Sequence, residues 1–174
     1  MRARLLLIPL LVPLVVLPLA ACSPAGDDEL TLVETKSPVQ LLRNEAWYRL
    51  PDFIVKESSE TTDVSVACSD DGMERSWTSS TIALVNNSFA PRTAAVAEDV
   101  IASFVSQGWA AAVGDAAEGE ETVLTKEGSI ATIAIHAVPK SDEHRASIAI
   151  TTTGPCVMTA GEDSDEVKVL EGRT

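Results

Sequence analysis

Two histidines, His136 and His144, are the side chains of this sequence best suited to proton transfer near neutral pH or to binding a metal through nitrogen. If residues 139–143 form the loop of a β-hairpin, both histidines lie on one face of the sheet, about 7–8 Å apart on a diagonal. With Asp142 or Glu143 they could form a zinc or copper site or a pH-sensitive patch. Such a site needs a third ligand on a rigid element, and the sequence supplies none. We therefore predict two surface histidines and no metal or other cofactor.

The sequence also lacks the motifs of the common enzyme classes. It contains no G-x-S-x-G segment of a serine hydrolase, since Glu127-Gly128-Ser129 has no second glycine, and no glycine pattern for binding nucleotides. Its 26 acidic residues lie mostly in expected loops, so no carboxylate pair for glycoside cleavage can be singled out. We therefore expect a protein that is not an enzyme. A hydrolase or metal enzyme built around the two histidines is the least favoured alternative.

Cys22 directly follows an apolar segment near the start of the chain. Arg2 and Arg4 supply the basic residues that begin a secretory signal, and residues 5–19 supply its apolar part. A run of about 15 apolar residues interrupted by prolines is too short to cross ~30 Å of hydrocarbon as a helix. The order of these features predicts a signal peptide over residues 1–21 that directs export.

The segment Leu19-Ala20-Ala21-Cys22 resembles the lipobox of bacterial lipoproteins. The resemblance implies that the Cys22 thiol carries a diacylglycerol, that cleavage occurs just before it, and that the protein is anchored at the extracytoplasmic face of the cell membrane. Two acyl chains meet the usual requirement for stable attachment. Residues 22–36 are rich in small and polar side chains, and we expect a lipidated flexible tether there. An ordinary secretory signal with a chance cysteine is the alternative.

Cys68 and Cys156 remain once Cys22 is assigned to lipid. An even pair of cysteines in an exported domain predicts a disulfide. It would close a loop of roughly 90 residues, for which loop-entropy models give about 4–5 kcal/mol of stabilisation. Neither cysteine has a second cysteine or a histidine at metal-ligand spacing, so the sequence does not support a metal site or a reactive thiol.

The chain is acidic, with 26 Asp and Glu against 13 Lys and Arg and a formal net charge of −13. A surface of this charge repels nucleic acids and anionic lipid headgroups, so neither is an expected partner. We expect a monomer. Acidic residues gather in residues 118–121 and 162–166, which we interpret as a solvated loop and part of a solvated tail.

Periodic apolar residues predict two helices. Ser37 and Pro38 are typical of a helix start, and apolar residues then recur every three or four positions as far as Leu50. The second helix, over residues 91–107, carries one apolar stripe and ends before Gly108, whose position suits a left-handed cap.

β-Branched and alternating residues predict five strands, in the segments 63–68, 77–85, 122–125, 130–138 and 146–153. The element order is then α-β-β-α-β-β-β, which predicts a two-layer α+β domain with an antiparallel sheet and its helices on one face. A bond between Cys68 and Cys156 would make the first and last strands neighbours. We expect a single domain over residues 37–159 and an acidic tail over residues 160–174 that is mobile at its end.

The pattern as a whole resembles small cell-envelope lipoproteins of actinobacteria. Besides the lipobox, the resemblance rests on a Ser-Pro-x-Gln-Leu-Leu-Arg-Asn segment, a cysteine on an early strand, Gly-Trp after the middle helix and a Thr-x-Pro-Cys ending. In this chain these features are residues 37–44, Cys68, residues 108–109 and residues 153–156. The resemblance implies location and architecture, and it transfers no activity.

Trp47 and Tyr48 are the best candidates for a contact surface. Only one of two adjacent helical residues can face inward, and exposed aromatic rings are enriched at binding surfaces. Alternatively, Trp47 lies under the tether and Tyr48 at the edge of the core.

The leading hypothesis is therefore a non-enzymatic, membrane-tethered envelope protein that binds or positions another protein or a cell-wall component. The alternative is a lipoprotein that holds a small molecule or a lipid between helix 91–107 and the sheet. Side-chain size at Val96, Val100 and Phe104 discriminates between them, because side chains that fill this layer would leave no cavity.

Overall fold

The computed structural model describes residues 30–114 and 121–173. The predicted signal peptide, Cys22, most of the predicted tether and most of the acidic run 118–121 lie outside the described residues. In chain order the elements are α1 (Leu32–Tyr48), β1 (Val55–Ala67), β2 (Glu74–Val85), the 3₁₀ helix η1 (Asn87–Arg92), α2 (Thr93–Val105), β3 (Ala110–Gly114), β4 (Glu121–Thr125), β5 (Thr132–Val138), β6 (Ser147–Thr153), β7 (Val157–Met158) and α3 (Asp165–Leu170).

The first helix begins earlier than predicted. α1 starts at Leu32 rather than Ser37, so the last part of the predicted tether belongs to the helix. The Glu34 carboxylate accepts hydrogen bonds from the backbone nitrogen and the hydroxyl of Thr31, at 2.8 and 2.7 Å, which closes the first turn. Pro38 therefore lies inside the helix, where a proline removes one backbone hydrogen bond. Burial of Leu32, which is fully enclosed by the core, offsets that loss.

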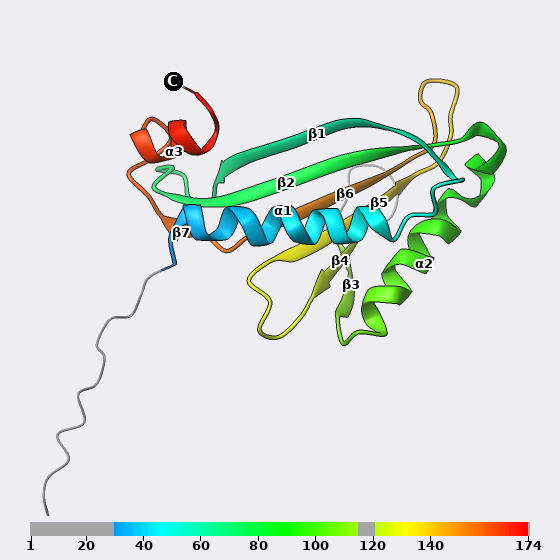
Figure 1. Cartoon of the computed structure of the whole chain (residues 1–174), viewed down its shortest axis with the longest axis horizontal. Coiled ribbons are helices and arrows are strands. Elements are labelled where there is room, and N and C mark those ends of the chain that lie inside the picture. Colours follow the sequence, from blue (N-terminus) through cyan, green and yellow to red (C-terminus); the bar gives the residue numbers. More distant parts are fainter. Residues whose placement is uncertain (1–29, 115–120, 174) are drawn as a thin grey trace, which may run out of the picture.

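The strands form one antiparallel sheet of seven strands in the order β1-β2-β6-β5-β4-β3, with the short β7 paired to the start of β2. α1 lies over β2 and β6, and α2 lies mainly over β5, β4 and β3 on the same face (Figure 1). The predicted α+β class with helices on one face of an antiparallel sheet is thus confirmed. β3 and β7 are additional to the five predicted strands.

The core fills the layer between these helices and the sheet. Trp77 of β2 is fully buried, and the Lys36 ammonium lies 4.5 Å from the centroid of its ring. Phe104 of α2 meets Trp109 edge to face, with 5.5 Å between ring centroids. Gly108 between them has a φ of 87°, the left-handed cap that the sequence predicts. Isoleucines of the two central strands complete the layer, namely Ile133, Ile135, Ile148 and Ile150.

The predicted pairing of the first and last long strands is wrong, because β2 lies between them. Thr78 of β2 pairs with Val64 of β1 on one side and with Thr153 of β6 on the other. The disulfide does not join those strands directly. Cys156 follows β6 and precedes β7, which returns the chain to the start of β2 beside the β1–β2 turn. A disulfide fixes the distance between two residues and does not by itself fix which strands pair.

The acidic residues of the run 162–166 are exposed, as predicted, but the tail also forms a helix that packs on the domain. Ser164 begins α3 by accepting a hydrogen bond from the backbone nitrogen of Val167, and Val167 is fully buried. The Lys36 ammonium donates a hydrogen bond to the carbonyl of Leu170 at 2.5 Å. The burial of Val167 thus helps to attach α3 to the domain. The acidic composition of the segment does not predict this contact.

Candidate functional site

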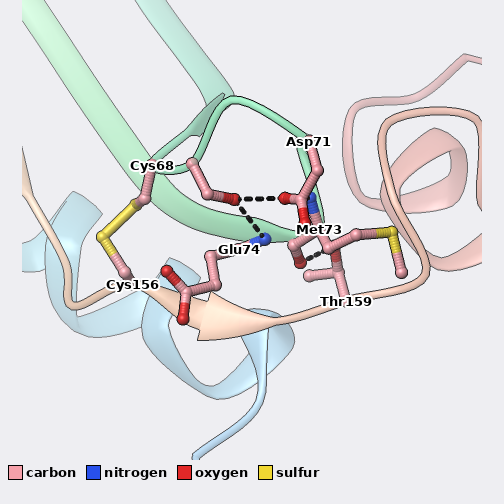
Figure 2. The surroundings of a disulfide bond; sticks show 7 residues. Cys68, Asp71, Met73, Glu74, Cys156 and Thr159 are labelled. Carbon is pink, nitrogen blue, oxygen red and sulfur yellow. Dashed lines mark hydrogen bonds between the residues drawn. A yellow bond between two sulfur atoms is a disulfide. The ribbon is translucent and has the colours of Figure 1, made fainter.

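The disulfide between Cys68 and Cys156 is present, as predicted. The two sulfur atoms are 2.06 Å apart and the Cα atoms 6.1 Å apart (Figure 2). In the adjoining turn, Asp71 accepts a hydrogen bond from the Ser69 hydroxyl at 2.6 Å and one from the backbone nitrogen of Met73 at 3.0 Å. These bonds, that from Ser69 first, hold the pKa of the Asp71 carboxyl below its ordinary value. Both thiols are used in the bond, so this site is a structural crosslink.

The two histidines do not form the predicted cross-strand pair. The register assumed Val138 opposite residue 144, but Val138 pairs with Ser147, and His144 lies in the longer loop that precedes β6. His136 lies within β5, opposite Glu121 of β4. Nowhere in residues 30–114 and 121–173 do three His, Cys, Asp or Glu side chains gather closely enough to hold a metal ion.

Trp47 and Tyr48 end α1 and face different ways. Tyr48 is 82% exposed, whereas Trp47 is half-buried against the core. Phe53, which is 68% exposed, meets Phe89 of η1 edge to face, with 5.6 Å between ring centroids. These four residues, here called the aromatic end, are all the aromatic residues that lie outside the buried core.

A groove lies between α2 and the sheet. Its first section has a volume of about 620 Å³ and lies between the start of α2 and strands β4 and β5. Ala94, Ala97 and Ile101 form the wall on α2, while Ile135 and Ala137 form the wall on β5. The space arises because most of these facing side chains are small, so the two layers do not meet there.

A second section, of about 420 Å³, continues the groove toward the end of α2. Glu98, Ile101 and Thr122 line both sections, so the two sections lie side by side, and together they are here called the α2 groove. The wall of the second section is formed by α2 and β3, chiefly by Val105 and Val113. The groove therefore runs along α2 and opens at the edge of the sheet where β3 lies.

The polar groups of the α2 groove are few and unevenly placed. Asn87 and Lys140 lie at the end where η1 meets the loop after β5, and Glu98 lies midway. The far end is lined by alanine and valine side chains. A long apolar ligand with one polar end suits such a lining, because its chain would contact apolar walls and its polar group would remain near water.

The large side chains of α2 that face the sheet fill the layer between them. Val96, Val100 and Phe104 are buried beneath α2. The groove lies instead along the flank of α2 that carries Ala97 and Ile101, each one position after a buried valine. The signal that could have located it is the set of alanines at residues 94, 97 and 102, which line the groove on α2.

Comparison with known proteins gives no relative: no family model, no curated protein and no solved structure matches this chain. In the part of the chain that the structure describes, every helix is too short or too polar to cross a membrane.

Proposed function

We propose that this protein is an exported lipoprotein, anchored through a diacylglycerol on Cys22 at the extracytoplasmic face of a bacterial cell membrane. Its role is to bind an apolar small molecule with one polar end, such as a single acyl chain, in the α2 groove. The observation that carries the proposal is the groove itself, with its apolar walls and its polar groups near one end and the middle. The location rests on the lipobox and the signal-like segment before it.

The dimensions of the groove support a ligand of this class. Small-molecule sites usually have volumes of about 300–1,000 Å³ and are lined mainly by apolar side chains with a few polar groups. The first section, at about 620 Å³, falls within that range. Among the described residues, the ionisable side chains that line the groove are Glu98 and Lys140, and Thr93 and Thr122 line it as well.

The test compares two neighbouring alanines of α2. Both Ala94 and Ala95 are exposed, but only Ala94 lines the groove. We expect Ala94→Trp to fill the first section and to weaken binding of a dansyl-labelled undecanoic acid by about tenfold or more. Ala95→Trp should bind the probe as the natural chain does. Fluorescence titration measures both, with circular dichroism to verify that each variant is folded.

Two outcomes would reject this function. One is the absence of saturable probe binding to the natural chain, and the other is equal binding by the two tryptophan variants. Either result would favour the second candidate, in which the protein binds or positions an envelope protein or a cell-wall component through the aromatic end. That candidate is supported by the exposure of Tyr48 and Phe53, since aromatic rings are enriched at binding surfaces. Replacing both by alanine should then abolish crosslinking to the partner.

A further inference from the structure

Lys140 is the only basic side chain that lines the α2 groove in the described part of the chain. It lies in the loop after β5, at the end of the groove where η1 contributes Asn87. No carboxylate of a described residue pairs with its ammonium. The ammonium is therefore available to a negatively charged group of a ligand, and hydrogen bonds between ionised groups are among the strongest in proteins.

Glu98 divides the groove electrostatically. It is the only acidic side chain among the described lining residues, and it contributes to both sections. Beyond it, toward the end of α2, the second section is lined by alanine and valine side chains, with Ile101 and the Thr122 hydroxyl beside them. A negatively charged group is thus attracted at the Lys140 end and repelled at the middle of the groove, and an apolar chain fits the far end.

We propose that the ligand of the α2 groove is a long-chain carboxylic acid, bound with its carboxylate at Lys140 and with its chain directed along α2 past Glu98. The walls extend far enough for such a chain, since Ala94 of the first section and Val105 of the second lie about 16 Å apart along the helix. Glu98 is exposed, so its carboxylate stays in water while the chain passes beneath it. This inference rests on the proposed function and adds to it the charge of the ligand's polar end.

A ligand with a cationic end suits the groove less well. Its cation would bind Glu98, which lies midway, and only one of the two sections would then remain for its chain. A carboxylate at Lys140 leaves both sections to the chain. The net charge of −13 attracts cations in general, but salt screens charges more than about 8 Å away at physiological ionic strength. The groups that contact the ligand therefore decide which charge is bound.

The experiment compares three ligands that share one chain and differ in the charge of the polar end, namely dodecanoate, dodecanol and dodecyltrimethylammonium. It uses residues 22–174 with Cys22→Ser, exported behind an ordinary signal peptide so that the disulfide forms, and it needs no detergent that would compete for the groove. Displacement of the uncharged fluorescent probe phenylnaphthylamine measures each affinity. We expect dodecanoate to bind about fivefold more tightly than dodecanol, as an ion pair in contact with water allows.

Two lysine variants assign that preference. Lys140→Gln should bind dodecanoate and dodecanol equally. Lys126→Gln, in the exposed turn between β4 and β5 and outside the groove lining, should keep the fivefold ratio. High salt should lower the ratio in the natural sequence because it screens the ion pair, whereas a purely structural role of Lys140 would not respond to salt in this way.

Three results would overturn the proposal: equal binding of dodecanoate and dodecanol by the natural sequence, a ratio that Lys140→Gln leaves unchanged, or tightest binding of dodecyltrimethylammonium. In each of them a ligand still occupies the groove, so the proposed function stands. Displacement of the probe by none of the three ligands would reject the proposed function and this inference together.

Discussion

Ser65 on β1 joins a buried arginine to the last helix of the chain. Its hydroxyl accepts a hydrogen bond from Arg75 Nε at 2.9 Å and donates one to the Glu171 carboxylate at 2.8 Å. Glu171 in turn contacts Arg173 Nε at 2.6 Å. Arg75 is only 5% exposed, so its charge depends on this network for compensation. A single hydroxyl thus links the edge strand, its neighbour and α3.

The ionisation of Glu171 follows from these contacts. Burial raises the pKa of the Glu171 carboxyl, but hydrogen bonds from Ser65 and the charge of Arg173 together outweigh burial, so its pKa lies below the ordinary 4.5. In the unfolded chain the pKa returns to about that ordinary value. The stability that Glu171 contributes is therefore complete above about pH 4.5 and is lost as the pH falls through the lower pKa of the folded state.

We predict that Glu171→Gln lowers the free energy of unfolding at pH 7 by about 1–3 kcal/mol, the usual range for hydrogen bonds to a charged group. The difference from the natural chain should be smaller at pH 3, because below the ordinary value of 4.5 the unfolded carboxyl takes up a proton and the contribution of the ionised Glu171 to stability declines. Urea unfolding at both pH values measures this. Glu127→Gln, in the exposed turn between β4 and β5, is the control and should change little. A loss of equal size at both pH values would show that the charge of Glu171 is not responsible.

Between elements, the strongest constraint is the bond that joins the β1–β2 turn to the segment before β7. Cys68 and Cys156 are 88 residues apart in the sequence, and the strands β2 to β6 and helix α2 all lie between them. β7 pairs with β2 through only two residue pairs, Glu74 with Met158 and Arg75 with Val157. So short a strand holds its place weakly by hydrogen bonds alone, and the disulfide keeps it in register.

Replacing both Cys68 and Cys156 with serine should lower the free energy of unfolding by about 2–5 kcal/mol, because the unfolded chain loses its crosslink. The dependence of that free energy on urea should also steepen, since the unfolded state becomes more extended. Urea unfolding with and without reductant checks both effects. Reductant should destabilise the natural chain and leave the serine variant unchanged. A natural chain that is insensitive to reductant after full reduction would contradict the prediction.

Across the whole molecule, α1 links two ends of different character. Its 17 residues span about 25 Å, from the end that holds α3 and the disulfide to the end near η1 (Figure 1). Leu32 opens the helix at the first end, and Tyr48 closes it at the second. With the proposed anchor at Cys22, only a short segment separates the membrane from Leu32. We therefore expect the disulfide end to lie nearer the membrane and the aromatic end to face away from it.

The anchor is tested by the fate of Cys22. We expect the natural chain, expressed in a bacterium, to enter the detergent phase of a Triton X-114 extract, and Cys22→Ala to leave it. Mass spectrometry of the natural protein should show loss of residues 1–21 and the added mass of a diacylglycerol on Cys22. Ser23→Ala, one residue further along, should partition as the natural chain does. A free Cys22 thiol that reacts with maleimide would refute lipidation.

Much of the fold could be predicted from local pattern. The apolar stripe of residues 91–107 predicted α2, and alternation predicted β2, β4, β5 and β6 to within a few residues. The prediction for β1 was wrong at its start, because the strand begins at Val55 and not at residue 63. The errors fall where tertiary contacts override local preference. Pro38 signals a helix start, yet burial of Leu32 extends α1 before it. Of the two valines in the acidic tail, Val167 is enclosed by the core as part of α3.

The site could be predicted only in part, for a physical reason. Pairing of Cys68 with Cys156 follows from the number of cysteines, whereas a groove is a property of facing surfaces. Ala94 and Ala97 predict no hollow until Ala137 is placed opposite them. Strand order likewise depends on contacts between distant residues, so β2 rather than β6 became the neighbour of β1.

By itself, the sequence determined the α+β class, the two main helices, the disulfide and the expectation of a lipid anchor, because each depends on residues close together or on a count. Only the tertiary structure decided where a groove lies between α2 and the sheet and which strands form the edges of the sheet. Both depend on how side chains and strands that are far apart in the sequence come together. The short-range periodicity of a sequence does not encode such contacts.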